Sequence, residues 1–129
     1  MAITMSTVTV DCADAARVAR FWADALGWDV APGPSVDVAA VGGPRRPPDT
    51  PSLLFVRVPE PKAGKNRWHL DLSATDLDAE LERLVGLGAT IVHRKSEWGA
   101  SWVTLRDPEG NEFCVALPHS VTEELAVST

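Results

Sequence analysis

Residues 7–28 read TVTVDCADAARVARFWADALGW, and this stretch decides the first half of the fold. Its first residues alternate polar and β-branched side chains, which is typical of a half-buried strand. From Ala15 onward, apolar residues recur at spacings of three and four, which predicts an amphipathic helix. Asp14 is a suitable N-cap for that helix, and Gly27 can take the left-handed conformation that ends it. The stretch therefore predicts a strand followed directly by a helix.

The same arrangement returns sixty residues later, since 67–88 reads RWHLDLSATDLDAELERLVGLG. A short strand-like run precedes a second helical stripe, with Thr75 or Asp76 as N-cap and Gly88 after the last turn. More strand-like runs follow the two helices, including 36–41 and 52–58 in the first half, then 89–93, 101–106 and 112–117 in the second. Each half therefore reads β-α-β-β-β. Two copies are too few for a solenoid, so we expect them to pair in one α+β domain.

We expect a single domain over 1–129, because this length suits one domain of ordinary size. Its expected parts are module one at about 4–58, a linker at 59–66, module two at about 67–117 and a tail at 118–129. Segment 32–51 is rich in proline, which predicts an irregular surface excursion. The sequence DPEGN at 107–111 predicts a tight hairpin turn.

The composition excludes several classes of protein. Hydrophobic residues make up 45% and charged residues 23%, as in globular domains. A net charge of −6 makes nucleic acid a poor partner. No run approaches the roughly 20 apolar residues of a membrane span, and the N-terminus lacks the features of a signal peptide. We therefore expect a cytoplasmic protein that binds no membrane and keeps Cys12 and Cys114 reduced.

Four segments of the chain resemble the vicinal oxygen chelate superfamily, which includes glyoxalase I, extradiol dioxygenases, fosfomycin-resistance proteins and bleomycin-binding proteins. The segments are, in order, DCADAARVARFWADALGW, KNRWHLDL, LVGLGAT and WVTLRDPEGNEFCV. Together they are similar to the glyoxalase-like and bleomycin-resistance-like members. The resemblance covers nearly the whole chain and implies paired βαβββ modules, whose sheets curl around a cleft with the helices outside. It also implies a homodimer, which would cover sheet edges and apolar surface.

Strand alternation assigns side chains to the two faces of each predicted sheet. The set expected to cover the helices is Val8, Val10, Cys12, Trp68, Leu70, Leu72, Phe113, Val115 and Leu117. The set expected to line the cleft is Thr7, Thr9, Asp11, Arg67, His69, Asp71, Glu112, Cys114 and Ala116.

Metal-dependent members of the superfamily take ligands from four positions, which the resemblance places near Thr7, Leu54, His69 and Cys114. Only His69 matches their ligand pattern. Leu54 has no donor atom, and one imidazole with one thiol leaves a divalent ion short of ligands. Asp71 or Glu112 could complete a metal site in principle, but each is displaced from its expected ligand position. We therefore expect no catalytic metal and no other cofactor.

Several candidate residues also have a structural interpretation. His69 is either a structural histidine or a group that contacts a ligand. Arg67 and Asp71 either form an ion pair or contact a substrate. Cys114 is best interpreted as a small buried apolar residue. Trp98 and Trp102 form either an aromatic wall for a ligand or a subunit contact.

Four functions fit this sequence. The first is a binding or resistance-type protein that holds a small organic molecule without a metal, with ligand contacts from Thr7, Thr9, Arg67, Trp98, Trp102 and Cys114. The second is a metal-independent isomerase, lyase or cyclase, in which His69 acts as general acid or base and Asp71 orients it. The third is a metal-dependent glyoxalase or dioxygenase, and the fourth is a structural or regulatory dimer.

Overall fold

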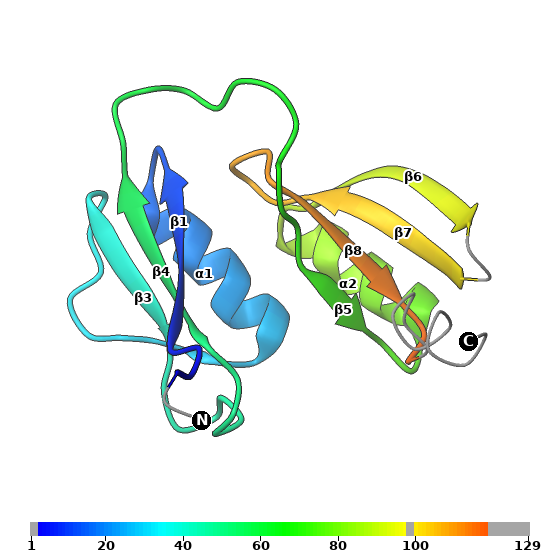
Figure 1. The fold of residues 1–129 in the computed structure, drawn as a ribbon, viewed down its shortest axis with the longest axis horizontal. Helices are drawn as coiled ribbons and strands as arrows, with labels where there is room; N and C mark the ends of the chain where they lie inside the picture. Colours follow the sequence, from blue (N-terminus) through cyan, green and yellow to red (C-terminus); the bar gives the residue numbers. More distant parts are fainter. Residues whose placement is uncertain (1–2, 98–99, 119–129) are drawn as a thin grey trace. The chain divides into compact units, whose positions relative to one another are not determined.

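The structure, a computed structural model, describes residues 3–97 and 100–118 (Figure 1). The chain divides into two compact units, Met1–Ala63 and Gly64–Thr129, and each is described by itself. Within the described residues, no helix has the length and apolar character needed to cross a membrane.

The first unit is one βαβββ module. Its elements are β1 (Thr7–Cys12), α1 (Ala15–Leu26), β2 (Asp29–Val30), β3 (Val38–Gly42) and β4 (Ser52–Arg57). The sheet has the order β1-β4-β3-β2, with β1 parallel to β4 and the other pairs antiparallel. Helix α1 packs on this sheet (Figure 1). Its buried residues include Val18, Phe21 and Trp22, which lie on the apolar stripe of the helix.

The second unit repeats this plan. Its elements are β5 (Asp71–Ser73), α2 (Leu77–Leu87), β6 (Thr90–Glu97), β7 (Ala100–Arg106) and β8 (Glu112–Ala116). The sheet has the order β5-β8-β7-β6, and here β5 is parallel to β8. The predicted α+β class with two βαβββ modules is therefore confirmed.

The predicted caps of both helices are present. The Asp14 carboxylate accepts a hydrogen bond from the backbone N–H of Arg17 at 3.1 Å, and Gly27 ends α1 with φ of 72°. At the second helix Asp76, not Thr75, is the N-cap, because its carboxylate accepts from the backbone N–H of Ala79 at 3.2 Å. These local hydrogen bonds explain why both helices begin where the sequence predicted.

Three apolar residues predicted to cover the helices do not do so. Trp68 is 82% exposed, Leu70 37% and Leu117 54%. The pairing of β5 with β8 begins only at Asp71, so strand alternation does not apply to residues 67–70. Strand β8 ends at Ala116, one residue before Leu117. The predictions for these three side chains, and for a strand starting at residue 67, were therefore wrong.

The proline-rich segment 32–51 contains β3 and is otherwise irregular. Arg45, in the second half of this segment, is hydrogen-bonded to the residues that follow α1. The guanidinium donates to the Asp29 carboxylate and to the Trp28 carbonyl, both at 2.9 Å. This ion pair with Arg45 lowers the pKa of Asp29.

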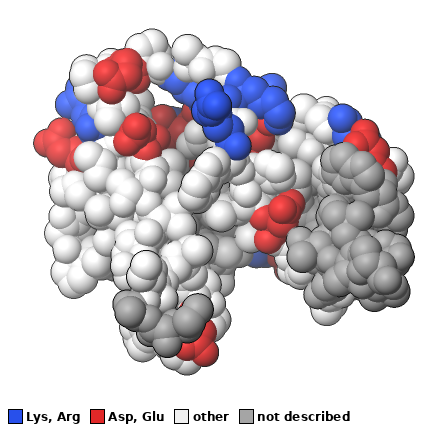
Figure 2. Space-filling model, in the orientation of Figure 1, with Lys and Arg blue, Asp and Glu red and all other residues white. Residues whose placement is uncertain are grey.

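Charged side chains on the surface lie in mixed groups. On the face shown in Figure 2, basic and acidic residues occur next to each other and much of the remaining surface is uncharged. Elsewhere in the described residues, ion pairs form between exposed side chains, including Arg20–Asp24, Arg57–Asp37 and Arg83–Glu80. Exposed pairs of this kind contribute little to stability.

Candidate functional site

The turn between β7 and β8 determines which residues meet in the second sheet. As DPEGN predicted, it is a tight turn, in which the Asp107 N–H donates to the Asn111 carbonyl at 2.9 Å. The Asp107 carboxylate accepts from the backbone N–H groups of Glu109 and Asn111, at 2.9 and 3.0 Å. This closure aligns β7 with β8 so that Thr104 lies opposite Cys114.

Three strands contribute to one row of side chains across the sheet. Asp71 on β5 pairs with Cys114 on β8, and Cys114 pairs with Thr104 on β7. Residues paired in this way project from the same face. We call it the site face, defined by Asp71, Cys114 and Thr104. The alternate residues of β8, Phe113 and Val115, are buried on the opposite face.

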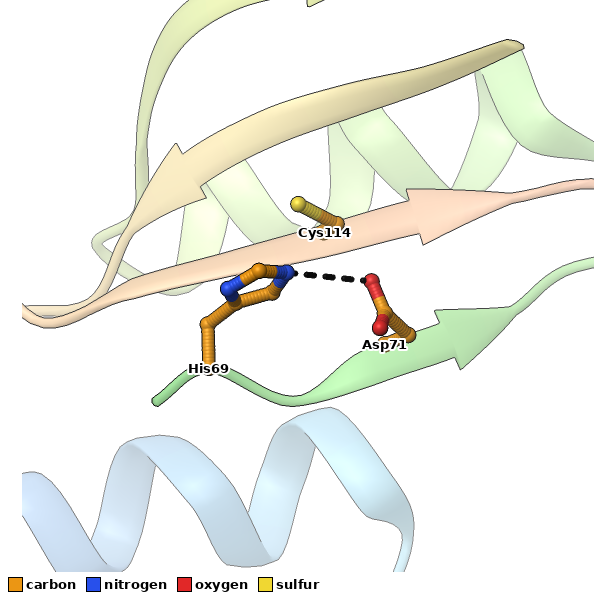
Figure 3. Close-up of side chains that lie close together, drawn as sticks. All are labelled: His69, Asp71 and Cys114. Atoms are coloured by element: carbon orange, nitrogen blue, oxygen red, sulfur yellow. Dashed lines mark ion pairs between the residues drawn. The ribbon is translucent and has the colours of Figure 1, made fainter. Parts of the chain in front are cut away.

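His69, Asp71 and Cys114 form a cluster on the site face (Figure 3). His69 Nε2 lies 3.4 Å from Asp71 Oδ1, and one ligand atom from each of the three residues lies within 4.8 Å of the others. Figure 3 shows the Nε2 edge of the imidazole turned toward both Asp71 and Cys114. The His69 side chain is 45% exposed and that of Asp71 is 71% exposed, whereas Cys114 is buried. The cluster therefore combines two accessible polar groups with a buried thiol.

The surroundings of Cys114 disfavour its thiolate. Burial raises the pKa of the thiol, and the carboxylates of Asp71 and Glu112 act in the same direction. The Thr104 hydroxyl lies 3.5 Å from the sulfur and, with Lys65, only partly opposes this rise. A catalytic nucleophile requires the thiolate, so this environment argues against that role for Cys114.

Glu112 is a second acidic residue near the cluster, two positions before Cys114 on β8. Its side chain is only 12% exposed and forms ion pairs with Lys65 and with Arg106, the latter at 3.9 Å. Because the Glu112 carboxylate is already paired with two cationic side chains, it is less available to a ligand than the carboxylate of Asp71.

Arg67 and the two tryptophans complete the candidates of the second unit. Arg67 is exposed and forms no ion pair with any described residue, and Asp71 pairs with His69 instead. The proposed Arg67–Asp71 pair is therefore wrong. Trp102 is half-buried and lies two residues before Thr104 on β7, which places it on the site face. Trp98 lies outside the described residues.

Thr7 and Thr9 lie in the first unit, on the exposed side of β1. The Thr7 hydroxyl is 3.1 Å from that of Ser52. Thr9 pairs with Leu54, whose side chain is a hydrocarbon. The prediction that these threonines contact the same ligand as His69 stays a prediction.

Sequence reasoning did not single out Thr104, although it contacts the Cys114 sulfur and is itself buried. The predicted turn at 107–111 contained the information needed to find Thr104, because the turn fixes which residues of the two strands lie opposite each other. Counting outward from DPEGN pairs Arg106 with Glu112, then Leu105 with Phe113, and finally Thr104 with Cys114. A correctly predicted hairpin therefore identifies this partner.

The four metal positions implied by the superfamily do not fit this chain. Leu54 has no donor atom, and the Thr7 hydroxyl is a weak neutral ligand already beside Ser52. Asp71, which lies outside that set, is the residue that joins His69 and Cys114. The donors that come together are therefore His69, Asp71 and Cys114, all from the second unit.

Comparisons with known proteins agree with this architecture. The sequence pattern of the glyoxalase-like domain family matches residues 7–116. Among solved structures, fosfomycin resistance protein FosX from Mesorhizobium loti is 14% identical, with a TM-score of 0.69 and coverage of 97% of this chain and 98% of its own.

Two further structures have the same fold. A glyoxalase/bleomycin resistance protein/dioxygenase family enzyme from Burkholderia phytofirmans PsJN is 16% identical, with a TM-score of 0.68 and coverage of 88% of this chain and 97% of its own. A possible glyoxalase from Bacillus cereus is 18% identical, with a TM-score of 0.67 and coverage of 89% and 99%. No curated protein matches this chain at a significant level.

Proposed function

The chain belongs to the glyoxalase-like domain family, which has the vicinal oxygen chelate fold, and on this premise we propose that it is a binding or resistance-type protein for a small organic molecule. The molecule would bind on the site face of the second sheet, and no metal is needed for this binding. Family membership supports the choice of a small-molecule ligand, and the residues of the site face support the location.

The observation that carries this proposal is the cluster of His69, Asp71 and Cys114. Two of its polar groups are accessible, so they can hydrogen-bond to a ligand without first giving up a buried partner. Trp102 lies on the same face and offers flat apolar surface for the rest of the molecule. Arg67 is an exposed cation close by in the sequence.

The test is a screen of small organic molecules in the presence of a chelator, with binding measured by calorimetry. His69→Ala is expected to raise the Kd of a bound molecule at least about tenfold, which corresponds to roughly 1.4 kcal/mol. Glu82→Ala is the control, because Glu82 is exposed on α2 and belongs to none of the strands that form the site face. It is expected to leave the Kd unchanged.

Circular dichroism distinguishes a binding role of His69 from a structural one. His69 is half-exposed, so its removal is expected to leave the melting temperature within a few degrees of the parent. If His69→Ala instead melts early while the folded fraction binds with the parent Kd, His69 is structural and the proposed site is wrong.

A metal-independent isomerase, lyase or cyclase is the second candidate, and the position of the imidazole favours it. His69 Nε2 faces the Asp71 carboxylate at 3.4 Å, and Nδ1 has no partner among the described residues. A histidine oriented by a carboxylate through one nitrogen can exchange a proton with a substrate through the other. Turnover of a bound molecule that is lost in His69→Ala and kept in Glu82→Ala would support this candidate over simple binding.

We also propose that the protein is a homodimer. A sheet of short strands leaves edges that a second copy can cover. Sedimentation velocity at tens of micromolar tests this, since an interface of roughly 1,600 Å² should hold at that concentration. A single monomeric species would contradict it.

A further inference from the structure

The site face changes in character from one end of its strands to the other. Its side chains form rows across the sheet, because paired residues project together and the next residue on the same face stands two positions along. The first row contains Arg106 and Glu112, the second Thr104 and Cys114, and the third Trp102. The rows lie about 7 Å apart, since a strand rises about 3.3–3.4 Å per residue. The face therefore runs from charged residues, through the cluster, to an aromatic side chain.

The first row has an excess of positive charge. The Glu112 carboxylate pairs with both Lys65 and Arg106. These two cationic side chains are 73% and 52% exposed, whereas Glu112 is 12% exposed. One largely buried carboxylate thus holds two accessible cations and neutralises the charge of only one. In a chain with a net charge of −6, this row is a local positive region.

Arg67 adds a third cation to this end of the face. It lies on the chain that leads into β5, whose start is joined to β8 by the Lys65–Glu112 pair. The end of this stretch is held by the Leu70 carbonyl, which accepts from the Cys114 N–H at 2.9 Å. The Arg67 side chain is exposed and forms no ion pair with any described residue. Figure 2 shows a group of basic side chains over this part of the chain. An unpaired guanidinium can donate two parallel hydrogen bonds to a carboxylate or a phosphate.

The other two rows suit different parts of a ligand. Asp71, beside the second row, is 71% exposed, so its carboxylate repels an anion there and accepts hydrogen bonds from donors. Trp102, in the third row, offers flat apolar surface. It lies about 13 Å along β7 from Arg106, since four residues separate the two. An anionic group is therefore favoured at the first row and an apolar group at the third.

We infer that the ligand is an amphipathic organic anion, a flat apolar body that carries a carboxylate or a phosphate at one end. The anionic group binds the cations of the first row, the middle of the molecule lies beside His69, and the apolar end packs on Trp102. This inference rests on the proposed function for the location of the ligand. It adds the charge of the ligand, the order of its polar and apolar parts, and a length of about 10–13 Å.

The test compares probes that differ only in one end group, with binding to the unsubstituted protein measured by calorimetry at low salt. The probes are biphenyl-4-carboxylate, the neutral biphenyl-4-carboxamide and the cationic 4-biphenylmethylammonium. The carboxylate is expected to bind at least about tenfold more tightly than the carboxamide, and the ammonium most weakly of the three. Ionic strength of about 0.5 M should remove most of this preference, because exposed charges are screened by salt. Biphenyl-4-yl phosphate, compared with the carboxylate, shows which of the two anions the first row prefers.

Variants separate the two ends of the ligand. Arg67→Gln and Arg106→Gln should each raise the Kd of the carboxylate about threefold, in keeping with the strength of exposed charge pairs, and leave that of the carboxamide unchanged. Trp102→Leu should raise the Kd of both probes by the same factor. Arg94→Gln is the matched control, because Arg94 is exposed on β6 and pairs with Val103, which is buried on the opposite face of the sheet. It should leave the preference for the carboxylate unchanged.

Three results would overturn the inference. They are equal Kd values for the carboxylate and the carboxamide, a preference that is unchanged in both arginine variants, and no binding of the carboxylate up to about 1 mM. The proposed function would not fall with it, because neutral molecules of the screen could still bind in a way that depends on His69. Conversely, a carboxylate preference that depends on the arginines but is unaffected by His69→Ala would support the anionic ligand and contradict the proposed role of His69.

Discussion

Replacing Asp107 with alanine is expected to destabilise the second unit more than any comparable change at an exposed acidic residue. Asp107 is buried, and its carboxylate holds the β7–β8 turn by accepting from the backbone N–H groups of Glu109 and Asn111. Its second oxygen lies 3.4 Å from the Asn111 side-chain amide. Alanine removes every one of these acceptors at once.

The size of the effect follows from these bonds. A hydrogen bond to a charged group contributes about 1.5–3 kcal/mol, and two strong ones are lost. Glu109 and Asn111 are only half-buried, so water can replace part of the loss. We therefore expect Asp107→Ala to lower the free energy of unfolding by about 2–4 kcal/mol. Asp107→Asn keeps one oxygen acceptor and should lose less than half as much.

Urea unfolding followed by circular dichroism measures this difference. Asp49→Ala is the matched control, since Asp49 is an exposed acidic residue in a proline-containing loop, and it should change stability by less than about 0.5 kcal/mol. Hydrogen exchange should quicken at the amides of Glu109 and Asn111 in Asp107→Ala. If Asp107→Ala costs no more than Asp49→Ala, the carboxylate does not hold the turn and the reasoning is refuted.

Three further outcomes are expected. Asp76→Ala should cost about 1 kcal/mol in urea unfolding through loss of the helix cap, and an equal cost for Thr75→Ala would contradict the assignment of the cap. Arg45→Ala should raise the pKa of Asp29 toward its ordinary value in an NMR titration, because the ion pair with Arg45 lowers it, and an unchanged titration would show that no such pair forms. The pair stabilises the fold at pH values above the unfolded-state pKa of Asp29, and this stabilisation is lost as the pH falls through the folded-state pKa. In a Cys12→Ala background at neutral pH, Cys114 should react with iodoacetamide far more slowly in the folded protein than in urea, and the folded-state rate should increase as the pH rises toward the raised pKa of the thiol. Equal rates in the folded and the urea-unfolded protein would show an accessible thiolate.

The helices were predictable because their signals are local. Caps, apolar spacing and the Leu-Gly ends all lie within a few residues of the helix they define. The start of β5 was not predictable in this way, since a strand extends only as far as its neighbour offers a partner. The residues around Trp68 alternate like a strand, but the ladder with β8 begins at Asp71. Short-range sequence patterns therefore predict which helices and strands are present better than they predict the residues at which a strand begins and ends.

The candidate site was predicted in part for the same reason. His69 and Asp71 are close in sequence and were expected to act together, and they do lie together. Cys114 joins them through the parallel pairing of β5 with β8, which places it opposite Asp71, 43 residues earlier in the chain. Thr104 was missed because its role depends on the register of β7 with β8 alone. Side chains that meet through strand pairing need the topology before their chemistry can be interpreted.

Comparison of the two modules shows what distinguishes the cluster in the second one. The positions sixty residues before His69 and Asp71 are Thr9 and Asp11, so one acidic residue recurs in both. In the first sheet Asp11 pairs with Val56, and in the second Asp71 pairs with Cys114. The shared carboxylate therefore has a hydrocarbon neighbour in one module and a thiol in the other. The two modules share one scaffold, so under the proposed function the difference between them arises from the strand that pairs with the acidic residue. Replacing Cys114 on β8 with the valine found at the matching position, Val56, is therefore the first exchange to make between the modules.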